Sequence, residues 1–590
     1  MGKHARKLAI PLVLICLGLT LSARIRRPLP LYGHSQAMDA FRQVVYDNAV
    51  RHGEIFPRWV PDFYFGHGSP IFQFYAPLPY MMAEPFVLAG FSVPTALKLT
   101  LVLAWILSGY FMLALAREYL SPEASFVAAV FYMLAPYHLV DMLVRHAFGE
   151  HIAFTWLAMA AAGAVGAARR RCPVSFTAGA FGVALLTLTH NITALIGVPV
   201  VAAWAAWESF RARSWERALV GLGAVAAGLG LAAFFWLPAM METKLVFARE
   251  SLTREFFEYG QHFVYAKQWF DPAWGFGGSR AGWEEDRLSF QIGLAHWLGI
   301  VLAVWAAVRV RRERGKLNEL FVPALAIFLA GLLMTHRFSA PLWNLAPLLA
   351  FVQFPWRFLV VAAFGASLLA GLGAESVLGD KRLRVPVGAC VVALAFYASY
   401  TKPLFTVYDT EQNGYIPGPY DLQRDRLDTD PRYADQREHL TIAWVRASGE
   451  TGSSRDDYLP RTVLEKPTAK EEIASASSGE VVASERAGLN TYELMVSMRA
   501  AGRVTLAQFF YPGWRATVDG AEVPVATTSP HGLASVEVPE GELAVRFHFG
   551  STPSRRAAGA VSIVSFALVA AAALLIRRRN RSTRSPVPAK

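Results

Sequence analysis

Long apolar stretches recur along the chain, and each is nearly free of ionisable residues at its centre. A helix that crosses a bilayer core needs about twenty apolar residues, and these stretches approach that length. The pattern therefore predicts a polytopic α-helical membrane protein with about twelve spans. The predicted spans are residues 8–23, 96–115, 124–143, 152–168, 175–189, 192–207, 219–238, 291–308, 321–335, 358–378, 385–400 and 558–576.

A different pattern occupies the long polar segment before the last span. In its second half, polar and apolar residues alternate with the two-residue period of β-strands, and turn signals such as Asp519-Gly520 separate the runs. We predict an antiparallel β-sandwich that is tethered to the membrane at both ends. The alternating runs are residues 492–496, 504–506, 515–518 and 543–547.

These two patterns divide the chain into four parts. Residues 1–400 are predicted to be the transmembrane domain, with a large first outer loop at 24–95. Residues 401–487 are charged and rich in Gly, Ser and Asp, which predicts a linker with irregular strands. Residues 488–556 are predicted to be the β-sandwich, and 557–590 the last transmembrane helix with a basic cytoplasmic tail.

The charge pattern orients the predicted spans. Lys and Arg gather in every second loop, which the positive-inside rule places in the cytoplasm together with both termini. The other loops and the predicted sandwich then lie outside, with Arg24, Arg26 and Arg27 as exceptions to the rule. Much of the net charge of +12 lies in the inner clusters, so we do not expect nucleic acid as a partner. The inner clusters are Lys3, Arg6 and Lys7; residues 169–171; Arg309, Arg311, Arg312 and Arg314; Lys381, Arg382 and Arg384; and residues 577–579.

Composition narrows the class further. The apolar share of 54% is higher than in ordinary soluble domains. Cys16 and Cys390 fall in predicted spans and Cys172 in a predicted inner loop, so we expect neither an external disulfide nor a zinc site. Cleavage of the first apolar stretch after Ala23 would put Leu21 where a small residue is needed, so we expect this span to be retained.

The first outer loop is the densest in candidate chemistry. Apolar residues recur at helical spacing in residues 38–52, which predicts an amphipathic helix at the membrane interface. Asp39 lies in its first turn, where the helix dipole favours an ionised carboxylate that can accept a proton from a hydroxyl. A general base and a simple stabiliser of the helix start both fit this position.

The rest of this loop combines turn residues with aromatic and polar side chains. Prolines and glycines in residues 57–80 predict fixed turns. Aromatic residues beside such turns can stack on sugars, line a lipid groove or form an interfacial belt. The candidates here are Trp59, Asp62, His67, Tyr75 and Tyr80.

Short outer turns and span ends supply a second group of polar residues. Arginine binds phosphate oxygens through paired hydrogen bonds, which makes Arg145 and Arg357 a candidate clamp for a lipid phosphate. Either arginine also fits the role of an anchor that extends to the interface. The group comprises Asp141, Arg145, His146, Glu150, His151, His190, Asn191, His336, Arg337, Trp356 and Arg357.

Several motifs lie in these loops and in the predicted sandwich. They are Trp59-Val60-Pro61-Asp62, Gly66-His67-Gly68-Ser69-Pro70, Phe74-Tyr75-Ala76-Pro77-Leu78-Pro79-Tyr80, Arg145-His146-Ala147-Phe148-Gly149-Glu150, Phe354-Pro355-Trp356-Arg357, Asp457-Tyr458-Leu459-Pro460, and Tyr511-Pro512-Gly513-Trp514-Arg515-Ala516 with Val518-Asp519-Gly520. Together they resemble the bacterial YfhO-like membrane proteins, and most closely the group labelled 6-pyruvoyl-tetrahydropterin synthase-related. The resemblance spans almost the whole chain.

That family is similar in architecture to GT-C glycosyltransferases, which move a sugar from a polyprenyl-phosphate donor to an acceptor at the outer membrane face. The resemblance thus implies a GT-C-like helical domain in a bacterial cytoplasmic membrane, with the C-terminal β-sandwich extracytoplasmic. It also implies an acid of the first outer loop as base or metal ligand. We assign that role to Asp39, although relatives often have Gly-His-Asp where this chain has Gly33-His34-Ser35. Either Asp39 substitutes for that acid or the activity is altered.

The implied reaction is an inverting displacement. Asp39, with Glu150 or Asp62 as alternates, would remove the acceptor proton, while Arg145 and Arg357 stabilise the departing lipid phosphate. The expected partners are a polyprenyl-phosphate-linked sugar, a glycan or lipid acceptor and membrane lipids. No cofactor is required by the pattern, and Mg²⁺ or Mn²⁺ binding by the outer acids is left open. The histidines expected to assist the phosphate are His67, His146 and His190, and the aromatics expected to stack on sugar or acceptor are Trp59, Tyr75, Tyr80 and Trp356.

Two other functions fit the sequence. Ion-coupled carriers place charged residues near mid-membrane, whereas the predicted spans hold little beyond His296, which disfavours ion coupling but not a passive lipid flippase. A non-catalytic accessory protein of envelope glycan assembly also fits, because the usual Gly-His-Asp acid is replaced.

Overall fold

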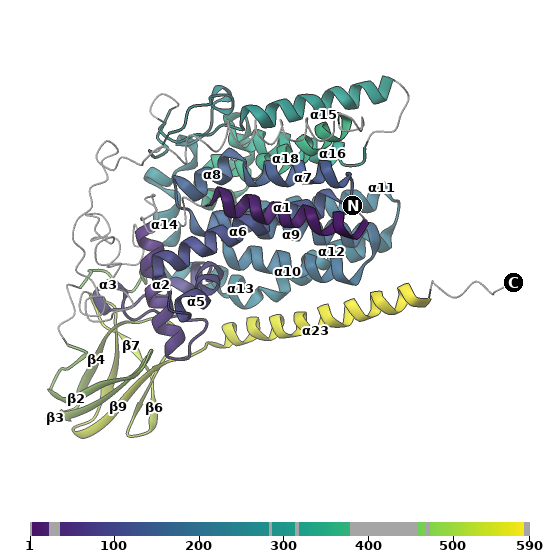
Figure 1. Ribbon diagram of the computed structural model, residues 1–590. Helices are drawn as coiled ribbons and strands as arrows, with labels where there is room; N and C mark the ends of the chain where they lie inside the picture. The colour runs from purple at the N-terminus through teal and green to yellow at the C-terminus, as the bar shows by residue number, and fades with distance from the viewer. Residues whose placement is uncertain are drawn as a thin grey trace.

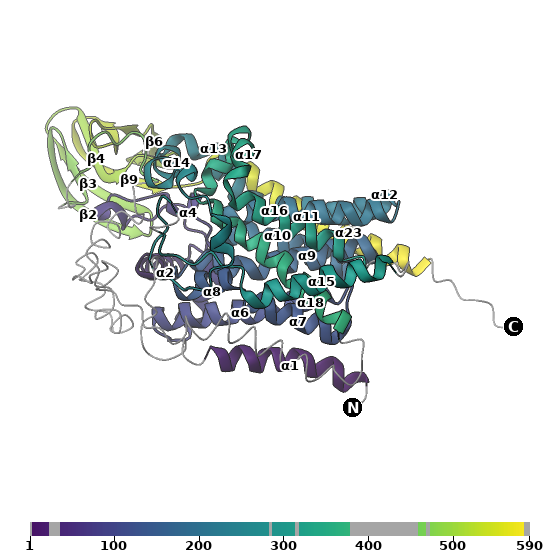
Figure 2. The same ribbon diagram turned by 90° about the horizontal axis from the view of Figure 1, so that it is seen from above.

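The computed structural model describes residues 3–22, 36–275, 277–282, 286–312, 318–377, 458–467 and 472–582. A bundle of long helices carries a β-sandwich at one end (Figure 1). Helix α23 (Pro553–Ser582) leaves the sandwich and runs along the bundle toward its other end, where α1 (Lys3–Leu21) begins (Figure 2). The chain therefore returns through the whole length of the bundle after the sandwich.

Among the described residues, six helices are long and apolar enough to cross a membrane, or nine spans if each of three bent helix pairs counts as one. The predicted helical architecture is present, but the predicted number of about twelve spans is not confirmed. The predicted span 385–400 lies outside the described residues. The six long helices are α6 (Val93–Ala116), α9 (Phe148–Arg170), α11 (Asn191–Arg211), α15 (Leu294–Arg312), α18 (Leu359–Val377) with the turn before it, and α23. Helix α10 (Pro173–Thr189) is apolar but shorter.

Two predicted spans, 124–143 and 219–238, are each a pair of helices. Pro136 opens the second helix of the first pair, and since proline lacks an N–H and disfavours a helical residue before it, the first helix ends at Met133. The two pairs are α7 (Pro122–Met133) with α8 (Pro136–Leu143), bent by 41°, and α12 (Trp215–Leu231) with α13 (Ala233–Glu242), bent by 65°. The predicted span 321–335 is α16 (Phe321–Thr335) alone, and it forms the third bent pair, at 89°, with the following segment Arg337–Leu345, which contains α17 (Ala340–Leu345).

Helices α9 and α10 pack with their backbones in direct contact. A Cβ added at Gly163 would lie 2.0 Å from the backbone nitrogen of Gly179, and one at Gly182 would lie 2.5 Å from the nitrogen of Ala160. At the sandwich end of the pair, a Cβ at Gly149 would lie 2.9 Å from the carbonyl oxygen of Thr189. Only glycine permits this approach, which fixes the start of α9 against the end of α10.

The first outer loop folds into four helices: α2 (Gln36–Arg51), α3 (Phe63–Gly66), α4 (Ile71–Phe74) and α5 (Leu78–Leu88). The predicted helix at 38–52 is thus confirmed. Its predicted position at the membrane interface stays a prediction. The exposed polar face expected of an amphipathic helix is wrong, however, because α2 is buried along nearly its whole length. Its inward polar side chains have partners: Asp39 accepts a hydrogen bond from Tyr80, and Gln43 donates one to Glu84.

The other segments near the sandwich end consist of short helical turns. They connect α13 to α15 and α16 to α18, and they cover the mouth of the bundle described below. They are η1 (Thr243–Leu245), α14 (Ala248–Thr253), η2 (Glu255–Phe257), η3 (Tyr259–Gln261), η4 (Ala266–Trp269), η5 (Arg337–Ser339), η6 (Pro347–Val352) and η7 (Pro355–Phe358).

The sandwich is built from two antiparallel sheets, with strand orders β1-β4-β8-β7 and β2-β3-β9-β5-β6. Inward residues of both sheets form one core, as the alternating pattern predicted. The sandwich begins before the boundary predicted at residue 488, since β1 precedes it and β2 ends on it. Strand β2 was not predicted because its largely exposed side chains show no alternation of apolar and polar residues. The strands are β1 (Ala474–Ala476), β2 (Gly479–Gly488), β3 (Thr491–Met498), β4 (Gly502–Phe509), β5 (Trp514–Val518), β6 (Ala521–Val523), β7 (Ala526–Thr527), β8 (Leu533–Val538) and β9 (Gly541–Phe549).

The sandwich docks on the first outer loop through a buried contact around Trp59. The Trp59 indole N–H donates to Gln508 Oε1 at 2.8 Å, and its ring stacks on Tyr511 with centroids 6.0 Å apart. Gly68, at φ +89°, lies so close that an added Cβ would be 2.4 Å from the Trp59 ring. Two motifs from opposite halves of the chain therefore meet here.

Candidate functional site

A cavity of about 500 Å³ lies where the helical bundle meets the outer segments. Its lining comes from α2, the α8–α9 turn, the α10–α11 turn, η2 and the stretch around η7. This volume suits a small polar group with part of a larger molecule. The residues that give the cavity its chemistry are Arg42, Tyr75, Arg145, His190, Trp356 and Arg357.

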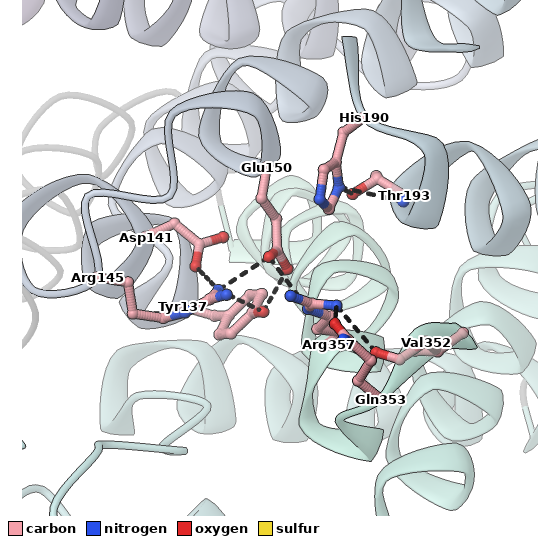
Figure 3. A network of polar contacts seen from close by, with 9 residues as sticks. All are labelled: Tyr137, Asp141, Arg145, Glu150, His190, Thr193, Val352, Gln353 and Arg357. Atoms are coloured by element: carbon pink, nitrogen blue, oxygen red, sulfur yellow. Dashed lines mark hydrogen bonds and ion pairs between the residues drawn. The ribbon is translucent and has the colours of Figure 1, made fainter. Parts of the chain in front are cut away.

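Arg145 projects from the turn between α8 and α9 (Figure 3). Its Nη1 lies 2.9 Å from Glu150 Oε2, and it also donates to the Asp141 carboxylate and, at 3.2 Å, to the Tyr137 hydroxyl. The guanidinium carbon lies 4.5 Å from the centre of the Trp356 ring. Burial opposes the charge on Arg145, but the neighbouring carboxylates outweigh it and raise the Arg145 pKa above its ordinary value.

Arg357 approaches the same glutamate from the other side (Figure 3). Its Nε lies 3.5 Å from Glu150 Oε2, and its Nη1 donates to the Val352 carbonyl and to Gln353 Oε1, both at 2.9 Å. Glu150, 2% exposed, also accepts a 2.5 Å hydrogen bond from Tyr137. One buried carboxylate thus holds two cavity arginines in place.

Arg42 adds a third guanidinium from α2. It lies over the Tyr75 ring at 4.0 Å, and its Nη1 is 3.8 Å from Asp39 Oδ1. Burial opposes the charge, but Tyr75, Tyr80 and Asp39 outweigh it and raise the Arg42 pKa above its ordinary value. Arg42 is therefore fully charged.

His190 caps the start of α11. Its Nδ1 accepts the backbone N–H of Thr193 at 3.3 Å, which assigns the ring proton of the neutral imidazole to Nε2. Burial lowers the pKa of His190 to about 4. The ring is therefore a neutral hydrogen-bond donor at physiological pH.

The charges at this site form two layers. Three arginines line the cavity, whereas three acids, Asp39, Asp141 and Glu150, lie behind them and are at most 2% exposed. A ligand in the cavity therefore meets guanidinium groups first, which favours an anion.

Five predicted site residues come together at this cavity: Tyr75, Arg145, His190, Trp356 and Arg357. Four others lie behind the lining. Asp39 is buried against Tyr80, whose hydroxyl donates to Asp39 Oδ1 at 2.8 Å. His146, expected to assist a phosphate, instead places Nδ1 3.9 Å from Asp39 Oδ2. Glu150, named as an alternate base, is engaged by both arginines.

The structure corrects the interpretation of Trp59, Asp62 and His67. None of them is in the cavity lining, and all three hold the sandwich. Asp62 pairs with Arg486 at 3.0 Å, and His67 stacks on Phe509 with ring centroids 5.5 Å apart. Their partners lie more than four hundred positions later in the sequence; Gln508, for example, is 449 positions after Trp59.

Sequence reasoning missed Arg42, Tyr137 and Gln353. Arg42 lies one helical turn after Asp39, and Tyr137, Asp141 and Arg145 are spaced by four, so helical spacing from the candidates already named would have found two of the three. Gln353 carries no such signal. No group of three or more His, Cys, Asp or Glu side chains that could hold a metal ion occurs in the described part of the chain.

Comparison with known proteins places the chain in a family. The family model described as "6-pyruvoyl-tetrahydropterin synthase related domain; membrane protein" matches residues 72–406, more than half of the chain. The chain belongs to this family. The resemblance inferred from the motifs is thereby confirmed, and this member of the 6-pyruvoyl-tetrahydropterin synthase-related family is a membrane protein. No curated protein sequence matches it.

Two solved structures are similar to this family member in part. One is the Archaeoglobus fulgidus oligosaccharyltransferase in complex with Zn and sulfate, with a TM-score of 0.39, 14% identity, and coverage of 72% of this chain and 56% of that chain. The other is ArnT from Cupriavidus metallidurans bound to undecaprenyl phosphate, with a TM-score of 0.30, 13% identity, and coverage of 63% and 79%. The chain thus spans little more than half of the oligosaccharyltransferase, and at these scores the likeness establishes neither a shared fold nor a shared activity.

Proposed function

We propose that this protein is a membrane glycosyltransferase of GT-C-like type, and that the arginine-lined cavity binds the phosphate of a polyprenyl-phosphate-linked sugar. The observation that carries the proposal is the convergence of Arg42, Arg145 and Arg357 on one cavity of about 500 Å³ in a membrane protein. Guanidinium groups match phosphate oxygens in geometry and charge. The Tyr75 ring beside them provides an apolar face for a sugar. The Trp356 ring, by contrast, is already covered by Arg145 and stacks on Phe354 with centroids 4.7 Å apart.

The layered charges suit such a donor. A sugar joined to a lipid phosphate is a phosphodiester with one negative charge, which the guanidinium groups of the lining can neutralise. Transfer breaks the bond between the anomeric carbon and the phosphate oxygen, and the electron pair stays on that oxygen. Arg145 and Arg357, already held by Glu150, stabilise this charge without rearranging.

Asp39 is the proposed general base. It lies on α2 between Met38 and Arg42, which both line the cavity, and its Oδ2 has no hydrogen-bond partner among the described residues. As the acceptor oxygen bonds to the anomeric carbon with inversion, its proton passes to Asp39. Tyr80 holds the other carboxylate oxygen and so orients the base.

The cavity is proposed to lie at the outer face of a bacterial cytoplasmic membrane. Basic residues at the ends of α9, α11 and α23 meet acids at the end of the bundle away from the sandwich, for example Arg169 with Glu319 and Arg579 with Glu216. The positive-inside rule places that end in the cytoplasm. The sandwich would then be extracytoplasmic.

The test is a transfer assay with the full chain in lipid nanodiscs, supplied with a polyprenyl-phosphate-linked sugar and glycan or lipid acceptors. We expect transfer, and we expect Asp39→Asn to lower kcat by at least about tenfold, a floor beneath typical general-base effects. Unchanged turnover in this variant would remove Asp39 from the mechanism. Movement of the donor lipid across the bilayer with no transfer would instead favour a flippase.

A further inference from the structure

A second, larger cavity adjoins the first. It has a volume of about 810 Å³ and is lined by the end of α13, by η1 and α14, and by the stretch from α17 to η6. Phe351 lines both cavities. The two cavities therefore share this side chain as part of their walls.

The second cavity carries uncompensated positive charge. Lys244 and Arg249 line it, are exposed, and have no ion-pair partner among the described residues. The acid in its lining, Glu250, is already neutralised, because Arg461 Nη2 lies 2.6 Å from each of its carboxylate oxygens. The remaining charge of the lining is thus that of two free cations, which favours an anionic group.

Apolar side chains are also exposed in the lining of this cavity. Met240 and Leu348 belong to the lining and are 60% and 54% exposed. Further large apolar side chains on the same elements are exposed as well, including Leu345 at 80% and Leu342 at 48% on α17. In a membrane protein, exposed apolar side chains that gather in one place mark a site of contact with lipid or with another apolar partner.

We propose that the second cavity binds the phosphate-bearing headgroup of an anionic membrane lipid, and that this lipid is the acceptor substrate. The inference rests on the proposed function and narrows its acceptor from a glycan or lipid to a lipid. Lys244 and Arg249 bind the phosphate, the acyl chains lie along α13 and α17, and a headgroup hydroxyl reaches past Phe351 to the anomeric carbon. A soluble glycan would need the polar groups of the lining but not the exposed apolar side chains.

The wall of the cavity is fixed, as an acceptor site requires. Tyr259 stacks on the buried Trp343 with ring centroids 5.0 Å apart, and its hydroxyl donates to Asn344 Oδ1 at 2.6 Å. The Asn344 side-chain amide then offers its N–H groups to the oxygens of a headgroup. Arg461 joins this wall to the segment that precedes the sandwich, since its Nε donates to the Val246 carbonyl at 3.1 Å.

The experiment measures lipid binding and sugar transfer separately. The full chain is placed in nanodiscs of phosphatidylcholine with or without phosphatidylglycerol, retained lipid is identified by mass spectrometry, and transfer of a labelled sugar to phosphatidylglycerol is followed. We expect the double variant Lys244→Gln/Arg249→Gln to raise the KM for phosphatidylglycerol by about tenfold or more, the effect of losing a charge-assisted contact. The KM for the donor should not change. Arg254→Gln, an exposed arginine of the same segment outside the lining, is the matched control.

The possible outcomes separate the two proposals. Transfer to a soluble glycan that the double variant leaves intact would overturn the lipid acceptor and keep the transferase. Retention of phosphatidylglycerol that depends on Lys244 and Arg249, with no transfer to any acceptor, would overturn the transferase and the acceptor role together. If glycerol phosphate or inorganic phosphate competes as strongly as phosphatidylglycerol vesicles, the cavity binds soluble anions and the lipid assignment is wrong.

Discussion

Arg555, in the first turn of α23, grips Glu242 at the end of α13 with two hydrogen bonds: Nε to Oε1 at 2.9 Å and Nη2 to Oε2 at 2.8 Å. The Tyr511 hydroxyl of the sandwich donates to the same carboxylate at 2.9 Å. Since all three groups are buried, this contact ties the sandwich, the last helix and the bundle together at one point.

Replacing Glu242 should loosen that junction. Glu242→Gln leaves Arg555 buried without a counter-charge, beside Arg58, whose pKa burial and the nearby Arg555 lower to about 10. Removing one partner of a buried ion pair costs about 3 kcal/mol or more. We expect a lower Tm in detergent and faster proteolysis between bundle and sandwich. Glu537→Gln, which breaks the exposed pair with Arg503, is the control and should leave both readouts unchanged.

Lysine should not support the function of the two cavity arginines, Arg145 and Arg357. Lysine keeps the charge but cannot make paired hydrogen bonds or span the distances that Arg145 and Arg357 bridge. We expect Arg145→Lys and Arg357→Lys each to lower kcat/KM for the donor by about a hundredfold, as for loss of a preorganised donor. Steady-state transfer kinetics measure this. Arg337→Lys, at an exposed arginine outside the lining, should behave as wild type, and equal activity in all three variants would contradict a phosphate clamp.

Glu150 should act by holding the arginines rather than as a base. Its carboxylate contacts Arg145, Arg357 and Tyr137. Glu150→Gln therefore removes the charge that holds both guanidinium groups in the positions in which they bind the donor. We expect a higher donor KM and a loss of stability of about 3 kcal/mol. Thermal unfolding and the separation of KM from kcat give the answer. A fall in kcat alone, with KM and Tm unchanged, would make Glu150 the base.

His190 should make the protein less stable in acid. Its folded pKa of about 4 lies below the ordinary value near 6.5, so between these pH values the unfolded chain binds more protons and stability rises with pH. This contribution is complete above about pH 6.5 and is lost as the pH falls toward 4. His190→Asn keeps an N-cap acceptor, and its Tm should fall less than that of wild type from pH 7.5 to 5. The exposed His52→Asn is the control, and parallel Tm losses would contradict the buried, neutral ring.

Much of this fold could be predicted because its signals are local. Long apolar runs predicted the helices, and a two-residue period predicted β3, β4, β5 and β9 at their observed places. Two helices that meet at a bend, as at Pro136, were predicted as one span, because hydropathy is averaged over a window longer than the break between them. The Gly33-His34-Ser35 departure lies outside the described residues.

The site was predictable only in part, because residue type does not say which neighbours a folded chain supplies. Arg145 and Arg357 were predicted because an arginine at the end of a membrane span usually either binds an anion or anchors the helix at the interface. Asp62 and His67 have equally suitable chemistry, yet their partners in the sandwich occupy them. Arg42 was overlooked because the helix that carries it was expected at the interface, where an arginine needs no partner.

The close contact of α9 with α10 has a consequence for where harmful substitutions would fall. Gly149 begins the same helix that carries Gly163 some four turns deeper, and Glu150 and His190 sit at the joined ends. A bulky residue at Gly163 would wedge the pair apart inside the bilayer and so disturb an anion pocket that it never touches. Sensitivity to mutation in this protein should therefore extend from the charged pocket into the bundle, along the row of glycines at which the two helices touch.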